Sequence, residues 1–181
     1  MIKQIIVFFL KPLCYLAFDR KFLKGRWFQS GQGGWVWAVK ALWFQKLLGF
    51  NRHIPFPISP SSKVSNPQNI IFHPDNLDNF QSNGCYFQNY NGKITLEHGV
   101  YIAPNVGIIT SNHNIENLDE SLPGKDVVIG KDSWLGFGSV VLPGVVLGPK
   151  TIVAAGAVVS KSFPQGNCVL AGVPATQLKR L

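Results

Sequence analysis

One histidine is placed where an imidazole could act on a bound molecule. His113 lies in the polar segment SNHN, at the start of a stretch that breaks a regular apolar pattern. An imidazole can take a proton from a hydroxyl near neutral pH, and a base in that role contributes typically ~10²–10⁴-fold to the rate. From spacing alone, a histidine on a surface loop is the simpler explanation. Cys14, Cys85 and Cys168 lack CxxC or Cys/His spacing, so neither a disulfide framework nor a zinc site is indicated.

The elements that must position His113 come from a six-residue repeat. Aliphatic residues recur every six positions without a slip, and a small residue follows most of them four places later, where a corner must be tight. A helix has a period of 3.6 residues and cannot produce this pattern. We therefore expect each six residues to form a short strand and a turn, with three units in a coil and coils stacked through parallel ladders. The aliphatic residues are Leu96, Ile102 and Ile108 before the break, and Ile129, Leu135, Val141, Leu147, Val153 and Val159 after it.

The repeat predicts an all-β fold with a helical appendage. We expect residues 56–181 to form a parallel β-helix with a loop extruded at about 109–128, followed by a short C-terminal tail. An antiparallel sandwich would not keep one register over this length. Residues 35–50, WVWAVKALWFQKLLGF, are apolar around most of a helical circumference, so the segment 1–55 is predicted to be helical and rich in aromatic residues. The handedness of the coils does not follow from the spacing.

The C-terminal half resembles a known family. The stretch VVIGKDSWLGFGSVVLPGVVLGPKTIVAAGAVVSKSFPQGNCVLAGVPATQLKRL is similar to the hexapeptide-repeat acetyltransferases, the group of the galactoside, maltose and nodulation-factor O-acetyltransferases. YIAPNVGIITSNHN, at 101–114, resembles the segment before that family's extruded loop. The overall pattern, including NRHIPFPISP, is most like the enzymes of capsule and surface-polysaccharide synthesis. The resemblance implies a left-handed β-helix, a homotrimer with active sites between subunits, acetyl-CoA as donor and a carbohydrate acceptor.

The same resemblance implies roles for individual residues. His113 falls on the catalytic histidine, and Asn83 on an active-site asparagine that orients the acceptor or assists the thioester oxygen. Asn91 stands where an acceptor-binding aspartate is usual, and Trp134 matches an aromatic residue beside CoA or the acceptor. An amide cannot accept two strong bonds from a diol as a carboxylate can, so we expect the acceptor to differ from the galactoside type. Read alone, both asparagines are turn residues.

A further set of positions is expected to contact acetyl-CoA, the co-substrate. The segment 171–175 resembles the adenine side of the family's cofactor site, and the basic residues of the set could meet phosphates as point charges. We expect no metal to be required. The cofactor residues implied by the resemblance are Trp134, Gly136, Phe137, Ala155, Ser160, Lys161, Lys179 and Arg180.

The N-terminal third is strongly basic and aromatic. Residues 1–60 hold nine Lys or Arg against Asp19 alone, whereas residues 61–181 hold eight of each sign. Indoles prefer the headgroup level of a membrane and cations meet anionic lipid, so we expect this segment to contact a membrane surface. A helix that packs on the β-helix or between subunits explains the same residues. Nucleic acid is not expected, because no RNA-binding or helix-turn-helix motif accompanies the charge.

The first residues are expected to remain on the protein. The apolar run 5–10 is short, Lys11 and Pro12 end it, and no Ala-x-Ala cleavage site follows. It is also shorter than the ~20 residues that span a bilayer. With no disulfide pattern, the sequence favours the cytoplasm, with peripheral attachment to the inner face of the cytoplasmic membrane.

Three other functions share the repeat. An antibiotic-modifying acetyltransferase also carries its histidine on an extruded loop. A non-catalytic hexapeptide scaffold subunit would lack both the histidine and the CoA-side segment. A γ-type carbonic anhydrase needs three zinc histidines, and only His98 and His113 fall within the repeat as predicted.

Overall fold

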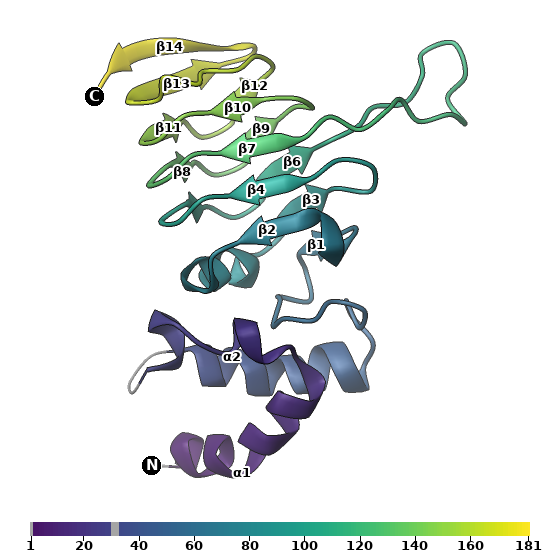
Figure 1. Ribbon diagram of the computed structural model, residues 1–181, viewed down its shortest axis with the longest axis vertical. Coiled ribbons are helices and arrows are strands. Elements are labelled where there is room, and N and C mark those ends of the chain that lie inside the picture. Colours follow the sequence, from purple (N-terminus) through teal and green to yellow (C-terminus); the bar gives the residue numbers. More distant parts are fainter. Residues whose placement is uncertain (1, 30–32) are drawn as a thin grey trace.

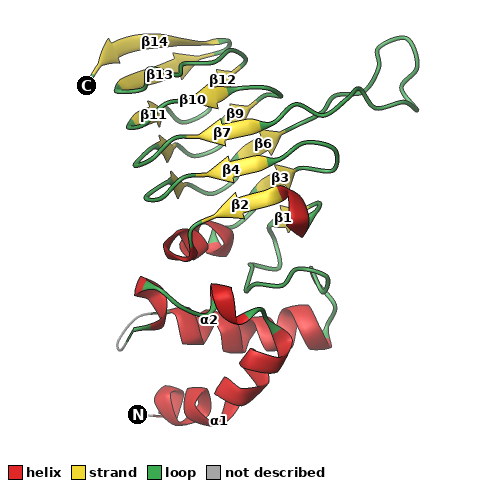
Figure 2. Cartoon of the chain, viewed as in Figure 1, coloured by secondary structure: helices red, strands yellow, loops and turns green. Residues whose placement is uncertain are grey.

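The chain forms a helical base with a stack of β-coils above it, and the computed structural model describes residues 2–29 and 33–181 (Figure 1). The helices of the base end at residue 47, and the strands begin at residue 63 with two short helices among the first of them (Figure 2). The N-terminus lies in the base and the C-terminus at the far end of the stack. The base contains α1 (Ile2–Ala17), η1 (Arg20–Phe22), η2 (Arg26–Phe28), α2 (Gly34–Ala41) and the π-helical turn η3 (Leu42–Leu47).

Three parallel sheets make the sides of the stack. The chain visits sheet A, then sheet B, then sheet C, and repeats this order from coil to coil. Sheet A contains β1 (Lys63–Val64), β3 (Tyr86–Gln88), β6 (Gly107–Ile109), β9 (Val140–Val141) and β12 (Val158–Val159); sheet B contains β2 (Ile70–Phe72), β4 (Ile94–Leu96), β7 (Val127–Ile129) and β10 (Val146–Leu147); sheet C contains β5 (Tyr101–Ile102), β8 (Trp134–Leu135), β11 (Thr151–Val153), β13 (Cys168–Gly172) and β14 (Ala175–Arg180).

The register confirms the six-residue repeat. Leu96 pairs with Ile129 in sheet B, and Val141 pairs with Val159 in sheet A, so equivalent repeat positions stand one above another. Every aliphatic residue predicted to point inward is at most 5% exposed, which makes one continuous apolar core through the coils. The parallel sheets and this register fit a left-handed β-helix, and the helical base means that the whole chain is not all-β.

The β-helix begins with an irregular coil. Two short helices, η4 (Pro67–Asn69) and η5 (Pro74–Gln81), belong to this coil, and η5 takes the place of a strand in sheet C. Two buried asparagines of η5 replace the missing ladder. The Oδ1 of Asn76 accepts from the N–H of Gly99 at 3.1 Å, and the Oδ1 of Asn79 accepts from the N–H of Ile102 at 2.7 Å. The second coil is therefore hydrogen-bonded to the first although no strand lies there.

The helical base packs on this first coil. A small second core, of Cys14, Phe18, Leu23, Ala38 and Ala41, holds α1 against α2. Aromatic rings of the base and the coil meet beyond it: Phe22 stacks on Phe72, and its edge meets Phe56. The helix predicted at 35–50 is present as α2 and η3. None of the described helices is both long and apolar enough to cross a membrane.

Two segments depart from the coil. The extruded loop occupies residues 110–126, between β6 and β7, within two residues of the predicted bounds. The expected C-terminal tail is instead β14, which turns back at Gly172–Ala175 and pairs antiparallel with β13. This hairpin ends the stack, so its edge strand covers the last parallel strand of sheet C.

Candidate active site

His113 lies at one edge of the β-helix. The loop that carries it leaves the coil where the chain passes from sheet A to sheet B, which we call the A–B edge. The loop is a hairpin: His113 bridges Ser121, and the Leu122 N–H donates to the carbonyl of Asn112 at 2.8 Å. These backbone bonds stabilise the hairpin, whose residues are mostly exposed.

A backbone contact selects the tautomer of His113. Its Nδ1 lies 2.8 Å from the carbonyl oxygen of Leu118. A carbonyl can only accept, so the proton of the neutral ring is on Nδ1 and the lone pair is on Nε2. The His113 side chain is exposed, and its ring therefore presents a fixed proton acceptor to any molecule bound at this edge.

Gln88 anchors the loop from below. Its Oε1 accepts from the N–H groups of Thr110 at 3.0 Å and Ser111 at 3.1 Å, and its Nε2 donates to the Ser111 hydroxyl at 3.0 Å. These bonds hold the two residues at which the chain leaves the coil. Sequence reasoning missed Gln88, which stands at the end of β3 where its amide can meet the strand above. The sequence offers only a weak signal, an amide three residues before Asn91.

Asn91 lies at the same edge, one coil below the loop. It follows β3 as the loop follows β6, and these strands are parallel neighbours. Gly124, at the returning end of the loop, approaches the backbone of Asn91 so closely that a Cβ there would meet its carbonyl group. The exposed Asn91 side chain and the base of the His113 loop therefore form one surface.

Asn83 lies at another edge. It precedes β3, at the C–A edge, where the chain passes from sheet C to sheet A. Its Oδ1 accepts from the hydroxyls of Ser61 at 3.1 Å and Ser59 at 3.3 Å, which fixes the exposed amide. Within one chain, the strands of sheet A separate Asn83 from His113.

The residues expected to contact CoA divide between the same edges. Gly136, Phe137 and Ala155 belong to the turns of the C–A edge, where a Cβ on Gly136 would lie 2.7 Å from the Ala155 nitrogen, so the turn needs glycine. Ser160 and Lys161 follow β12 at the A–B edge and are exposed. The Phe137 side chain is 55% exposed and is free to meet a ligand.

Trp134 and the basic residues of β14 lie on sheet C. Trp134 is 51% exposed on the outer face and pairs in register with Tyr101, which is 48% exposed. The two rings form an open aromatic surface. Lys179 and Arg180 are exposed on the last strand, paired with Val169 and Cys168. One chain therefore gathers Asn91, His113, Ser160 and Lys161 at one edge but holds Asn83, Phe137 and Ala155 at another.

The fold and the repeat define a class, and comparisons with known proteins agree with it. The class is the parallel β-helix built from hexapeptide repeats. Residues 126–161 match the family model described as bacterial transferase hexapeptide (six repeats). Nodulation protein L of Rhizobium meliloti is 34% identical over 127 residues, 65% of this chain and 67% of that protein. This chain belongs to the hexapeptide-repeat acetyltransferase family, in the group of the galactoside and maltose O-acetyltransferases and nodulation protein L.

Two further matches bear on the function. A protein of Escherichia coli named as the lipopolysaccharide biosynthesis O-acetyl transferase WbbJ is 34% identical over 123 residues, 61% of each chain. A solved maltose O-acetyltransferase from Clostridium difficile 630 superposes with a TM-score of 0.56 and 30% identity, covering 66% of this chain and 63% of that one. Several other curated relatives are matched over only about half of their length (54%, 50% and 44%).

Proposed function

We propose that this protein is an acetyl-CoA-dependent O-acetyltransferase with a carbohydrate acceptor, and that His113 is its general base. The observation that carries the proposal is the Leu118 carbonyl on Nδ1 of His113, which leaves Nε2 free to accept a proton. A sugar hydroxyl barely ionises at neutral pH, so its attack on a thioester needs such a base. The family, and a maltose O-acetyltransferase among the similar structures, support the reaction class.

The reaction balances with these groups alone. Nε2 of His113 takes the hydroxyl proton while the acceptor oxygen bonds to the acetyl carbonyl carbon. The carbon–sulfur bond then breaks, and the CoA sulfur leaves with that proton. No covalent enzyme intermediate and no metal are needed. Ser160, Lys161 and Phe137 are assigned to CoA, and Lys179 and Arg180 to its phosphates.

The site is proposed to form between subunits of a homotrimer. The support is the division of the assigned residues between two edges of one chain, because no single chain gathers His113 and Asn83 at one edge. A second copy that placed its C–A edge or sheet C against the His113 loop would join the two groups. Trp134 and Tyr101 would then offer an aromatic surface to the acceptor or the pantetheine arm.

Mixing inactive subunits tests the shared site. His113→Ala and Asn83→Ala chains are each expected to be inactive, and a mixture refolded together should recover activity, because some sites combine an intact His113 with an intact Asn83. A mixture as inactive as its components would show that both residues act within one chain.

We propose synthesis of a surface polysaccharide as the setting, and attachment to the inner face of the cytoplasmic membrane. The match to WbbJ supports the setting. The three cysteines are free and buried, which suits a reducing compartment. The face of α1 turned away from α2 is exposed and apolar, with Phe8 and Phe9 each 71% exposed and Leu16 85% exposed. Such a surface beside Lys11 and Arg20 fits an anionic lipid surface.

Vesicle sedimentation tests the attachment. The protein should sediment with vesicles containing phosphatidylglycerol and stay in solution with vesicles of phosphatidylcholine alone. The double variant Phe8→Ser, Phe9→Ser should lose this binding, whereas Val173→Ser, an equally exposed apolar site at the other end of the molecule, should keep it. Equal sedimentation of all three proteins would show that this face of α1 does not attach the protein to the vesicles.

A CoA-release assay tests the proposed activity. Wild type, His113→Ala and the matched control His53→Ala are each supplied with acetyl-CoA and a panel of oligosaccharides, nucleotide sugars and a hydroxylated antibiotic. We expect acceptor-dependent CoA release by wild type and His53→Ala and a loss of about 10²–10⁴-fold in His113→Ala. Release only with the antibiotic would favour a xenobiotic acetyltransferase, and no release with any acceptor would favour a scaffold subunit.

A further inference from the structure

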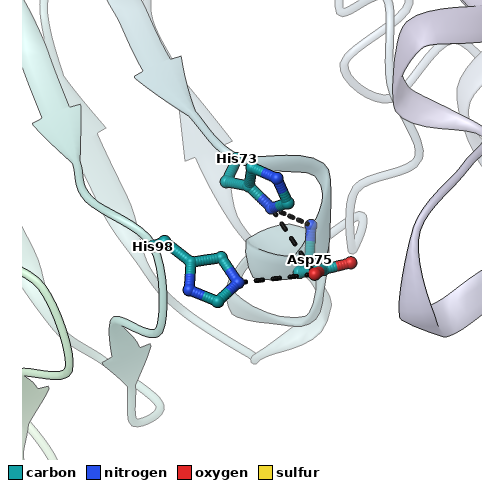
Figure 3. Close-up of side chains that lie close together, drawn as sticks. All are labelled: His73, Asp75 and His98. Atoms are coloured by element: carbon teal, nitrogen blue, oxygen red, sulfur yellow. Dashed lines mark hydrogen bonds and ion pairs between the residues drawn. The ribbon is translucent and has the colours of Figure 1, made fainter.

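Two histidines and an aspartate meet at a third edge of the β-helix, where the chain passes from sheet B to sheet C (Figure 3). His73 directly follows β2, Asp75 lies in the first turn of η5, and His98 lies in the turn after β4. The parallel pairing of β2 with β4 stacks these turns, which brings the three side chains together. His73 therefore also belongs to the coils, where the sequence reading counted only His98 and His113.

The three side chains point at a common centre. Oδ2 of Asp75 lies 3.4 Å from Nε2 of His98 and 3.6 Å from Nδ1 of His73. One donor atom from each residue lies within 4.8 Å of the other two, and the imidazole rings meet edge to face at 4.7 Å. Asp75 is turned toward the histidines because its other oxygen accepts from the N–H of Arg26 at 2.7 Å.

The arrangement leaves two acceptors facing each other. Nδ1 of His73 accepts from the N–H of Asp75 at 3.2 Å, so this nitrogen carries no hydrogen. The same nitrogen faces the Asp75 carboxylate at 3.6 Å. The single lone pair of Nδ1 is directed at the Asp75 N–H, so a cation placed beside the carboxylate would bind Nδ1 after a small turn of the exposed His73 ring.

We propose that His73, Asp75 and His98 bind one divalent transition-metal ion, with Zn²⁺ preferred. Two imidazoles and a carboxylate suit Zn²⁺, Co²⁺ and Ni²⁺, whereas Mg²⁺ and Ca²⁺ select oxygen ligands. Donors about 2.0–2.1 Å from a tetrahedral ion lie about 3.3–3.5 Å apart, close to the two measured distances to Asp75. Both histidine rings are exposed and can turn toward the ion, and its fourth position faces solvent.

The ion would join the base to the first two coils. The Asp75 carbonyl accepts from Nε1 of Trp27 at 2.8 Å and from Nε of Arg26 at 3.2 Å, so the cluster already ends a chain of contacts to the helical base. The positive charge of the Arg26 guanidinium repels a nearby cation, but the ion pair of Arg26 with Asp78, at 3.7 Å, reduces this repulsion. Because His113 lies at a different edge, we assign the ion a role in stability and not in acetyl transfer.

Metal titration of tag-free protein tests the proposal. After EDTA treatment and dialysis, Zn²⁺ is added in a calorimeter, and Co²⁺ binding is followed by visible absorption. Wild type should bind one ion per chain with a Kd below about 10 µM. At Zn²⁺ near 100 times this Kd, its Tm should rise by about 5–10 °C.

Three variants locate the ion. His73→Asn keeps an acceptor for the Asp75 N–H but removes the imidazole. His98→Gln removes the second imidazole without removing a backbone hydrogen bond. Each variant should weaken Zn²⁺ binding at least tenfold. His53→Ala, an exposed histidine outside the cluster, should bind as wild type does. Less than half an ion per chain at 100 µM Zn²⁺, unchanged binding in His73→Asn and His98→Gln, or loss in His53→Ala would each overturn the proposal.

Discussion

Two buried serines in the same slot of the repeat are predicted to respond oppositely to alanine. Ser133 and Ser139 each lie four residues after an inward aliphatic residue, and both are fully buried. The Ser133 hydroxyl accepts from the Thr151 N–H at 3.0 Å and donates to the Gly148 carbonyl at 3.3 Å. The Ser139 hydroxyl has no hydrogen-bond partner among the described residues. The slot accepts a methyl group, because Ala157 fills it three repeats after Ser139.

The magnitudes follow from these contacts. Ser133→Ala leaves a buried N–H unpaired and should lower the free energy of unfolding by about 1–3 kcal/mol. Ser139→Ala removes a buried hydroxyl without a partner and should raise it by about 1 kcal/mol. For a chain of this size, the Tm should fall by about 2–10 °C in the first variant and rise by about 2–4 °C in the second. Thermal unfolding followed by circular dichroism, at one protein concentration, measures both. Tm shifts of the same sign in both variants would refute the claim that the hydrogen bonds of the two hydroxyls decide the effect of the substitution.

Three further results are expected. Trp134→Ala should raise the KM for acetyl-CoA or the acceptor about 2–10-fold in steady-state kinetics, because it removes an exposed ring from sheet C, and an unchanged KM would exclude Trp134 from the site. Gln88→Met should lower kcat about tenfold with little change in KM, because it frees the residues that begin the His113 loop. If the amount of folded protein fell by the same factor as the activity, the role of Gln88 would be purely structural. Burial raises the pKa of the Cys14 thiol to about 11, so the folded chain keeps a proton that the unfolded chain loses above pH ~8.5. This contribution to stability is lost as pH rises toward 11, and urea unfolding of Cys14→Ala should show a weaker decline there than wild type.

The sequence predicted the coils because a period of six is a strong signal. One residue in six recurs as an inward aliphatic residue, three of them before the extruded loop and six after it. The first coil was harder to predict. There Asn76 and Asn79 replace a strand with side-chain hydrogen bonds, and this replacement leaves no apolar period to read.

The sequence named candidate site residues, but it did not predict how they are arranged. The position of His113 followed from the break in the repeat, whereas the carbonyl that sets its tautomer belongs to the backbone at Leu118 and has no side-chain signature. Gln88 accepts a hydrogen bond from Thr110, which lies in the coil above and 22 residues away in the chain. The cluster of His73, Asp75 and His98 depends on the stacking of turns from successive coils, and the loose spacing of the first coil hid that stacking.

The most direct measurement of the central claim is the chemistry of the product. Mass spectrometry of an acceptor oligosaccharide incubated with acetyl-CoA should show the gain of one acetyl group with wild type and with His53→Ala, and none above background with His113→Ala. Mild alkali should remove the group, because it is an ester of a hydroxyl. An alkali-stable acetyl amide, or equal acetylation by His113→Ala, would contradict O-acetyl transfer with His113 as the base.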